Sequence, residues 1–217
     1  HHKEEKFIMK LKKIASLALA GIMAVSMLAG CKDGGNSNSG SSSSEVTTVS
    51  GAAAALNNAL SQNKDVVKFE DDSNLDKNLE AHFKLNPIKG DEWAESNYGK
   101  IGQANTDYAE LKSVVGASYI GLTNYEQIVE SKSPDWNDKK VAVVGMFNAK
   151  VYTQAEALKM VGKAIDNFDY AEDTNITDDG KEFTYSGKAS VLEVKSEGGT
   201  ASVWVVVAVV TRGYEKV

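Results

Sequence analysis

The 217-residue sequence is poor in the side chains that most often build metal and redox centres. Cysteine occurs once, at Cys31, so no disulfide and no Cys-x-x-Cys pair can form within one chain. Apart from the two histidines that open the sequence, His82 is the only histidine. These shortages exclude thiol redox pairs and sites with several histidine ligands.

Positive charge is also scarce. Arg212 is the only arginine, and the formal net charge is −6. Residues 1–30 hold five Lys and two Glu, so a chain that began at Cys31 would carry a charge of −9. Nucleic-acid binding needs a basic surface that neutralises phosphates. The composition therefore predicts no nucleic-acid partner.

The longest apolar run near the beginning of the sequence is short for a membrane span. It extends from Ile14 to Ala29, includes two serines, and follows three lysines between positions 10 and 13. A spanning helix needs roughly 20 consecutive apolar residues. A basic segment followed by a shorter apolar run is typical of a signal peptide.

The run ends at Leu28-Ala29-Gly30-Cys31, which resembles the lipobox of bacterial lipoproteins. The resemblance implies a diacylglycerol thioether on Cys31, cleavage before this cysteine and acylation of the new amino terminus. We therefore expect residues 1–30 to comprise upstream residues and a lipoprotein signal peptide. Two or three acyl chains anchor a protein far more firmly than one. This predicts an exported protein held on the outer face of the bacterial cytoplasmic membrane.

The residues before this signal peptide fit no signal-peptide pattern. The codons of Lys3-Glu4-Glu5-Lys6 can spell a purine-rich ribosome-binding sequence a few bases before Met9. We therefore expect translation to start at Met9. The alternative is that the two opening histidines remain from recombinant expression.

Residues 31–44 follow the lipobox and are rich in glycine and serine. From Lys32 to Ser44 the sequence has no apolar side chain to bury, which predicts a flexible tether. Its typical reach would be on the order of 20 Å. Residues 45–217 then have the length of a single domain with a substantial core.

The first half of this domain, residues 45–135, has the apolar spacing of helices. Two stripes carry the pattern: Val49, Ala53, Leu56 and Leu60, then Leu75, Leu79 and Phe83. The second stripe should end before Asn86-Pro87. Asp107-x-x-Glu110 and the capping box Thr123-x-x-Glu126 are expected to begin further helices, after a long loop over residues 88–103.

The second half, residues 141–217, has the spacing of a β-α-β-β unit. The expected elements are a strand over Val141–Tyr152, a helix begun by the capping box Thr153-x-x-Glu156, a strand from Phe183, and a last strand over Thr200–Thr211. Gly198-Gly199 should form the hairpin turn between the last two strands.

The last strand is almost continuously apolar, which is typical of a central strand that is covered on both faces. Its neighbours would then be the two other strands, running parallel to each other in a split β-α-β arrangement. We expect an α+β fold in which N-terminal helices pack on a C-terminal antiparallel or mixed sheet, covering the face opposite the second-half helix.

Three motifs resemble parts of catalytic sites, and each is incomplete. Gly116 to Gly121 is one residue too long for the Gly-x-Ser-x-Gly elbow, and Ser61-x-x-Lys64 lacks its companion elements. His82 stands beside Phe83 in an apolar stripe, as an ordinary helix histidine would. We predict no catalytic residue from these motifs.

The carboxylate-rich stretch Asp166–Glu182 offers candidate calcium ligands in Asp173, Asn175, Asp178 and Asp179. Calcium prefers oxygen ligands, and Asp173-x-Asn175-x-Thr177 begins like an EF-hand loop. The pattern fails later, because Asp178 stands at the glycine position and Thr184 at the position of the bidentate glutamate. The alternative is a solvated loop with a turn at Asp178-Asp179-Gly180.

A second candidate ligand site comprises Asp91, Glu92 and Trp93. Carboxylates can bind sugar hydroxyls while an indole stacks on the ring. The alternative is an acidic loop whose tryptophan packs on the core. No phosphate-binding glycine loop or dinucleotide motif accompanies these residues.

Two functions remain open from the sequence. The first is a surface lipoprotein whose domain binds a cell-wall glycan or a protein without catalysis, with no cofactor beyond the diacylglycerol on Cys31. The second is a hydrolase of glycans or cell wall that uses a pair of carboxylates not yet located. The absence of a complete catalytic motif favours the first.

Overall fold

The structure is a computed structural model that describes residues 45–89, 99–172 and 181–216. The strands are β1 (Val46–Thr48), β2 (Val67–Asp71), β3 (Lys100–Ile101), β4 (Tyr119–Ile120), β5 (Lys140–Asn148), β6 (Lys181–Lys195) and β7 (Ser202–Lys216). The helices are α2 (Ala52–Ala59), α3 (Ser73–Leu85), α5 (Leu111–Val114), α6 (Leu122–Glu130) and α7 (Gln154–Asp166), with a 3-10 helix η1 (Pro134–Trp136). None of the helices in these ranges is long and apolar enough to cross a membrane.

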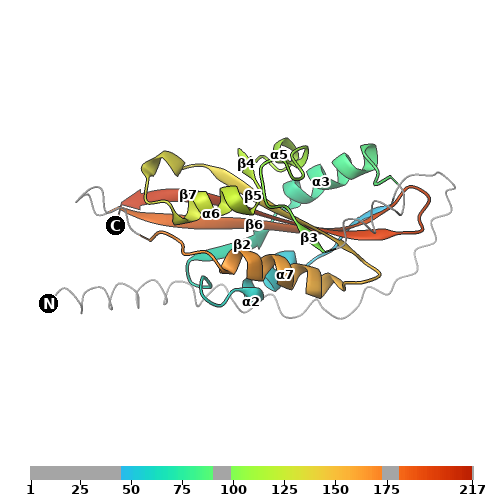
Figure 1. The fold of residues 1–217 in the computed structure, drawn as a ribbon, viewed down its shortest axis with the longest axis horizontal. Coiled ribbons are helices and arrows are strands. Elements are labelled where there is room, and N and C mark those ends of the chain that lie inside the picture. The colour runs from blue at the N-terminus through green and yellow to red at the C-terminus, as the bar shows by residue number, and fades with distance from the viewer. Residues whose placement is uncertain (1–44, 90–98, 173–180, 217) are drawn as a thin grey trace. The chain divides into compact units, whose positions relative to one another are not determined.

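All seven strands belong to one mixed sheet, which confirms the predicted α+β class. The order is β1-β6-β7-β5-β3, with β2 also beside β6 and β4 also beside β5. The two longest strands, β6 and β7, pair antiparallel along their whole length, from Lys181↔Lys216 to Lys195↔Ser202 (Figure 1). Gly198 and Gly199 form the turn between β6 and β7, as predicted, and both have the positive φ angles that glycine readily adopts.

The split β-α-β arrangement is also confirmed. β5 and β6 are each antiparallel to β7, which lies between them, so β5 and β6 run parallel to each other. Helix α7 connects them and begins with the predicted capping box, in which Thr153 and Glu156 bind each other's backbone amides. Strand β5 ends at Asn148, earlier than predicted, because the Asn148 side chain accepts a bond from the Lys150 amide and closes a turn.

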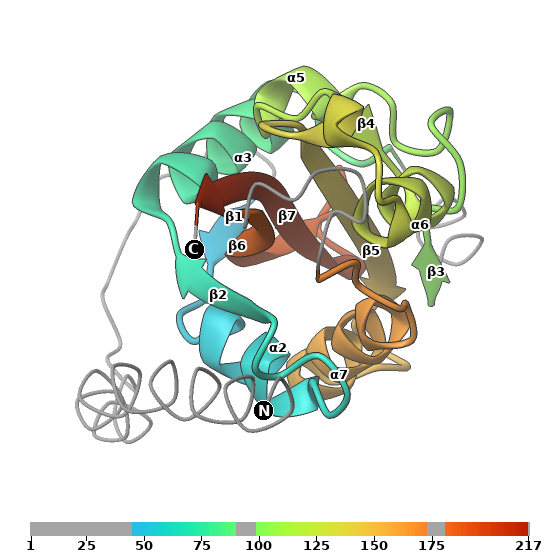
Figure 2. The ribbon, with the colours of Figure 1, turned by 90° about the vertical axis from the view of Figure 1, so that its left-hand side faces the viewer.

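Strand β7 is apolar throughout because both of its faces are buried. Val206, Ala208 and Val210 lie in one core layer, while Val205, Val207 and Val209 lie in the other. Seen along the strands, helices lie on both sides of β7 (Figure 2). The prediction of a central last strand is therefore confirmed.

The distribution of the helices differs from the prediction. We expected the first-half helices to cover the face opposite α7, but α2 and α6 share the core layer of α7, and only α3 and α5 cover the other face. Gly162 of α7 explains part of this arrangement. A Cβ at that position would lie 2.5 Å from the Ala59 Cβ, so only glycine lets α2 approach so closely.

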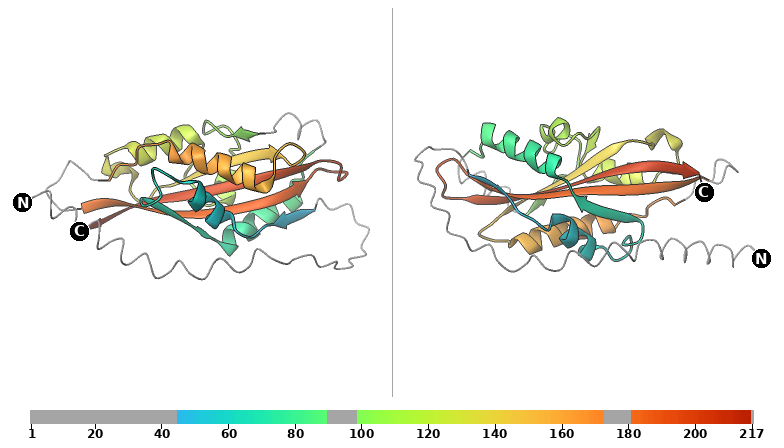
Figure 3. Two further views of the ribbon diagram at one scale, coloured as in Figure 1. Left: turned by 90° about the horizontal axis from the view of Figure 1, so that it is seen from below. Right: turned by 180° about the vertical axis from the view of Figure 1, so that it is seen from behind.

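The first half is less helical than predicted, because it also supplies short strands to both edges of the sheet. β1 and β2 pair with β6, and β3 and β4 pair with β5 (Figure 3). Val49 precedes α2 and donates its amide to the Val191 carbonyl. At the outer edge of β2, the Asn57 carboxamide bonds both the amide and the carbonyl of Phe69, as a further strand would. The predicted loop over residues 88–103 includes β3.

Two of the predicted helix starts are wrong. α6 begins at Leu122, after Gly121, and has no side-chain cap, so Thr123 and Glu126 form no capping box. A Cβ at Gly121 would lie 2.6 Å from the Ala104 carbonyl oxygen, and this close approach fixes where the helix begins.

α5 begins only at Leu111, because the Asp107 carboxylate accepts the Gln103 amide in a preceding turn. α3 ends before Asn86 as predicted.

Candidate functional site

The residues predicted as ligands lie outside the described residues. This holds for Cys31, for the possible sugar ligands Asp91, Glu92 and Trp93, and for the possible calcium ligands Asp173, Asn175, Asp178 and Asp179. Their assignments therefore stay predictions. Within the described ranges, no group of three or more His, Cys, Asp or Glu side chains could hold a metal ion.

The residues of the incomplete catalytic motifs occupy ordinary structural positions. His82 is half-buried on α3, with its ring edge-on to Phe83 at a centroid distance of 5.1 Å. Ser118 is exposed ahead of β4, and its amide donates to the Lys140 carbonyl. Ser61 lies in the loop after α2, where its amide binds Asp166.

Asp166 shows that part of the acidic stretch has a structural role. Its carboxylate accepts the backbone amides of Ser61, Gln62 and Asn63 at 2.8 to 3.1 Å. The buried Asn63 side chain donates in return to the carbonyls of Asp166 and Phe168. The carboxylate thus connects the loop after α2 to the end of α7.

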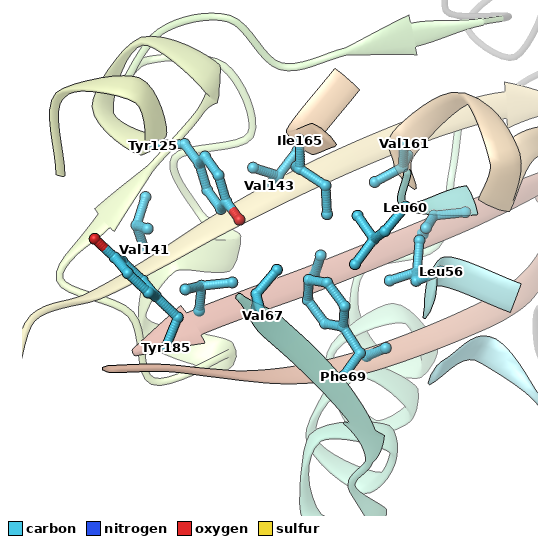
Figure 4. Packing of buried hydrophobic residues seen from close by; sticks show 14 of the residues in the cluster. Leu56, Leu60, Val67, Phe69, Tyr125, Val141, Val143, Val161, Ile165 and Tyr185 are labelled. Carbon is cyan, nitrogen blue, oxygen red and sulfur yellow. The ribbon is translucent and has the colours of Figure 1, made fainter. Parts of the chain in front are cut away.

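One group of buried side chains with polar ends consists of Tyr125, Tyr170, Tyr185 and Arg212, here called the tyrosine–arginine cluster. It joins four segments: helix α6, the chain after α7, strand β6 and strand β7. Figure 4 shows Tyr125 and Tyr185 with their hydroxyls at one end of the apolar layer that also contains Val141 and Ile165.

Arg212 is fully buried at the carboxyl end of α6. Its Nη1 donates to the Ile128 carbonyl at 2.8 Å and to the Ser131 carbonyl, and its Nη2 donates to the Ser133 carbonyl. The guanidinium lies 4.0 Å from the centroid of the Phe183 ring. This is a cation–π contact combined with the capping of a helix end.

The electrostatics of Arg212 are unusual for a buried charge. Among the described residues, no carboxylate lies within ion-pair distance of it, and its Nε has no hydrogen-bond partner. The carbonyl dipoles at the carboxyl end of α6 compensate the positive charge instead. Burial lowers the pKa of Arg212, while the neighbouring Tyr185 raises it.

The three tyrosines are joined by one hydrogen bond between hydroxyls, by ring contacts and by bonds to the backbone. The Tyr185 hydroxyl lies 2.7 Å from the Ala171 carbonyl and 3.0 Å from the Val129 carbonyl, and shares its single proton between them. The Tyr125 and Tyr170 hydroxyls are hydrogen-bonded to each other. The Tyr170 and Tyr185 rings meet edge to face at 4.9 Å.

Burial determines the protonation of these tyrosines. It raises the pKa of Tyr185 to about 12 and raises the pKa values of Tyr125 and Tyr170 further. The tyrosines are therefore neutral and the arginine is charged at neutral pH. The hydrogen bonds of the cluster hold its four segments together.

A second polar cluster lies under α3. The buried Ser190 hydroxyl donates to the Asp76 carboxylate, and Thr48 donates to Glu80 one turn later. Desolvation raises the pKa of Asp76, and the charges of Asp71 and Glu80 add to this effect. These bonds fasten α3 to β6 and β1.

Sequence reasoning identified neither cluster, although one signal was present. Arg212 continues the alternation of Val206, Ala208 and Val210, so its side chain points to the same buried face. A single arginine at a position where the alternation predicts a buried side chain indicates a buried cation. The tyrosines come from segments far apart in the sequence, so spacing alone could not group them.

Comparison with known proteins gives no match, because no family model, curated protein or solved structure is similar to this chain. No role for the tyrosine–arginine cluster comes from a relative. A functional proposal must therefore start from the residues of this chain.

Proposed function

We propose that this protein is a lipid-anchored bacterial surface lipoprotein whose domain, residues 45–217, is a non-catalytic binding or envelope-interaction module. The lipobox-like Leu28-Ala29-Gly30-Cys31, after a basic and then an apolar segment, carries the proposal. The glycine- and serine-rich stretch that follows would separate the domain from the lipid surface.

Two groups of polar side chains among the described residues serve the fold of the domain. The tyrosine–arginine cluster bonds backbone carbonyls and its own hydroxyls, and Asp166 accepts three backbone amides. These side chains stabilise the domain. The acidic composition directs the choice of partner toward a cell-wall glycan or a protein and away from nucleic acid.

Membrane retention tests the anchor. In a bacterial host, the wild-type chain should partition into the detergent phase, and Cys31→Ser should release the protein or leave it as uncleaved precursor with no lipid. A matched control carries Cys31→Ser together with Ser37→Cys, which restores a thiol outside the lipobox. We expect no lipid attachment in this control. Equal partitioning of a cleaved Cys31→Ser variant would contradict the proposal.

Ligand capture tests the domain. The soluble fragment of residues 45–217, which contains both core layers, should be applied to an array of cell-wall glycans and envelope peptides. We expect the fragment to bind a glycan or a peptide on the array without cleaving it. Steady release of cleaved fragments would show a hydrolase instead.

A further inference from the structure

The chain enters the sheet at one particular end. Val46 of β1 pairs with Val194, and the Glu45 carbonyl accepts the Lys195 amide at 3.0 Å. An ion pair between the Lys195 and Glu45 side chains fixes the same point. Since Lys195 is the last residue of β6, the segment that leads from Cys31 meets the domain beside the β6–β7 hairpin turn.

The opposite end of the sheet carries the loop of residues 131–139. The Arg212 side chain binds the carbonyls of Ser131 and Ser133, and its backbone bonds Asp138 and Lys139. Arg212 is ten positions along β7 from Ser202, which pairs with Lys195, so the loop is roughly 30 Å from the hairpin end. Figure 1 shows β1 near the hairpin and the end of β7 on the opposite side.

We propose that the domain is held to the membrane by its hairpin end, so that the loop of residues 131–139 points away from the lipid. This inference rests on the lipid anchoring proposed above. Only the fourteen residues from Cys31 to Ser44 separate the lipid from Glu45, and a segment of this composition reaches on the order of 20 Å.

The physical reason is that the membrane excludes those orientations in which the domain would enter the lipid. A domain held at its hairpin end can tilt, but it cannot place its far end inside the lipid. Averaged over the orientations that remain, the loop of residues 131–139 is farther from the lipid than the hairpin. Its formal charges balance, with Lys132 and Lys139 against Asp135 and Asp138, so anionic lipid headgroups exert little net attraction on it.

The absence of a second cysteine makes this orientation measurable. Glu197→Cys places a single thiol at the hairpin and Lys132→Cys places one in the far loop, and both side chains are exposed. The mature variants, with Cys31 carrying lipid, are labelled with a donor dye and inserted into phosphatidylcholine vesicles that contain an acceptor lipid. Lys159→Cys, near the middle of α7, provides an intermediate position.

We expect energy transfer to the lipid to be highest from position 197, intermediate from position 159 and lowest from position 132. Equal transfer from all three positions, or the reverse order, would overturn the orientation. Flotation of the same vesicles separates the two proposals. Protein that floats with the wrong transfer order contradicts the orientation alone, whereas protein that does not float contradicts the anchor. Thermal melting of each labelled variant confirms that it is folded.

Discussion

The guanidinium of Arg212 lies on the ring of Phe183, 4.0 Å from its centroid, and is surrounded by backbone carbonyls where most buried arginines have a carboxylate. Phe183 and Arg212 come from neighbouring strands of the hairpin. The contact therefore joins β6, β7 and the end of α6 at one point. The chain has one arginine, and it serves the interior of the domain rather than its surface.

Arg212→Met should lower the free energy of unfolding by on the order of 3 kcal/mol, because it removes the donor that one buried and two part-buried carbonyls share. Arg212→Lys should recover only part of this loss, since an ammonium group cannot reproduce the planar fork on Phe183. Urea denaturation of residues 45–217 measures both. The exposed Lys132→Met is the control, with an expected change within about 0.5 kcal/mol. An Arg212→Met variant as stable as this control would contradict the assigned role.

Val207→Asp should destabilise the domain by several kcal/mol, because Val207 is buried in the centre of β7 and the new carboxylate would have no partner. Val151→Asp introduces the same charge at a site that is 56% exposed and should change little. Thermal melting of both variants provides the comparison. Similar melting temperatures would place β7 at an exposed edge, against the observed topology.

The approach of α2 to α7 predicts a coupling between Gly162 and Ala59. Gly162→Ala should cost about 1–3 kcal/mol, because the added methyl would lie 2.5 Å from the Ala59 Cβ. Adding Ala59→Gly removes that contact and should recover part of the loss. A double-mutant cycle measures the interaction. Additive effects of the two substitutions would show that the helices are not packed this closely.

The two aspartates at the start of α3 should respond to pH with opposite signs. Folding raises the pKa of Asp76 above 3.8, so ionisation of this group costs stability as pH rises through that region. The Leu75 and Asn74 amides lower the pKa of Asp72, so its contribution is present at neutral pH and is lost as pH falls below 3.8.

Asp76→Asn and Asp72→Ala therefore form a matched pair. Each effect is a difference from wild type in the free energy of unfolding. The effect of Asp76→Asn should be more stabilising at pH 7 than at pH 3, whereas that of Asp72→Ala should be more destabilising at pH 7 than at pH 3. Urea denaturation at the two pH values measures the trend. The same direction of change for both variants would contradict the assigned environments.

The parts of the fold that follow from local pattern could be predicted. β7 is apolar on both faces, Gly198-Gly199 forms the turn, and Thr153 with Glu156 begins α7. Each of these features depends on neighbouring residues in the sequence. The split β-α-β-β unit then follows from the central position of β7.

The parts that depend on distant contacts could not be predicted. β2 is five residues long and pairs with β6 across more than a hundred residues, and the Asn57 side chain replaces the strand that would cover its outer edge. The start of α6 depends on the contact between Gly121 and Ala104. The tyrosine–arginine cluster likewise gathers side chains from four separate segments, and periodicity carries no signal for such a grouping.

The lipid anchor at Cys31 is tested most directly by the mass of the N-terminal peptide of the membrane-extracted protein. We expect this peptide to begin at Cys31 and to carry the mass of a diacylglycerol thioether, with or without an additional acyl group on the amino terminus. A peptide that still contains residues 9–30, or one that begins at an unmodified Cys31, would contradict the lipoprotein assignment.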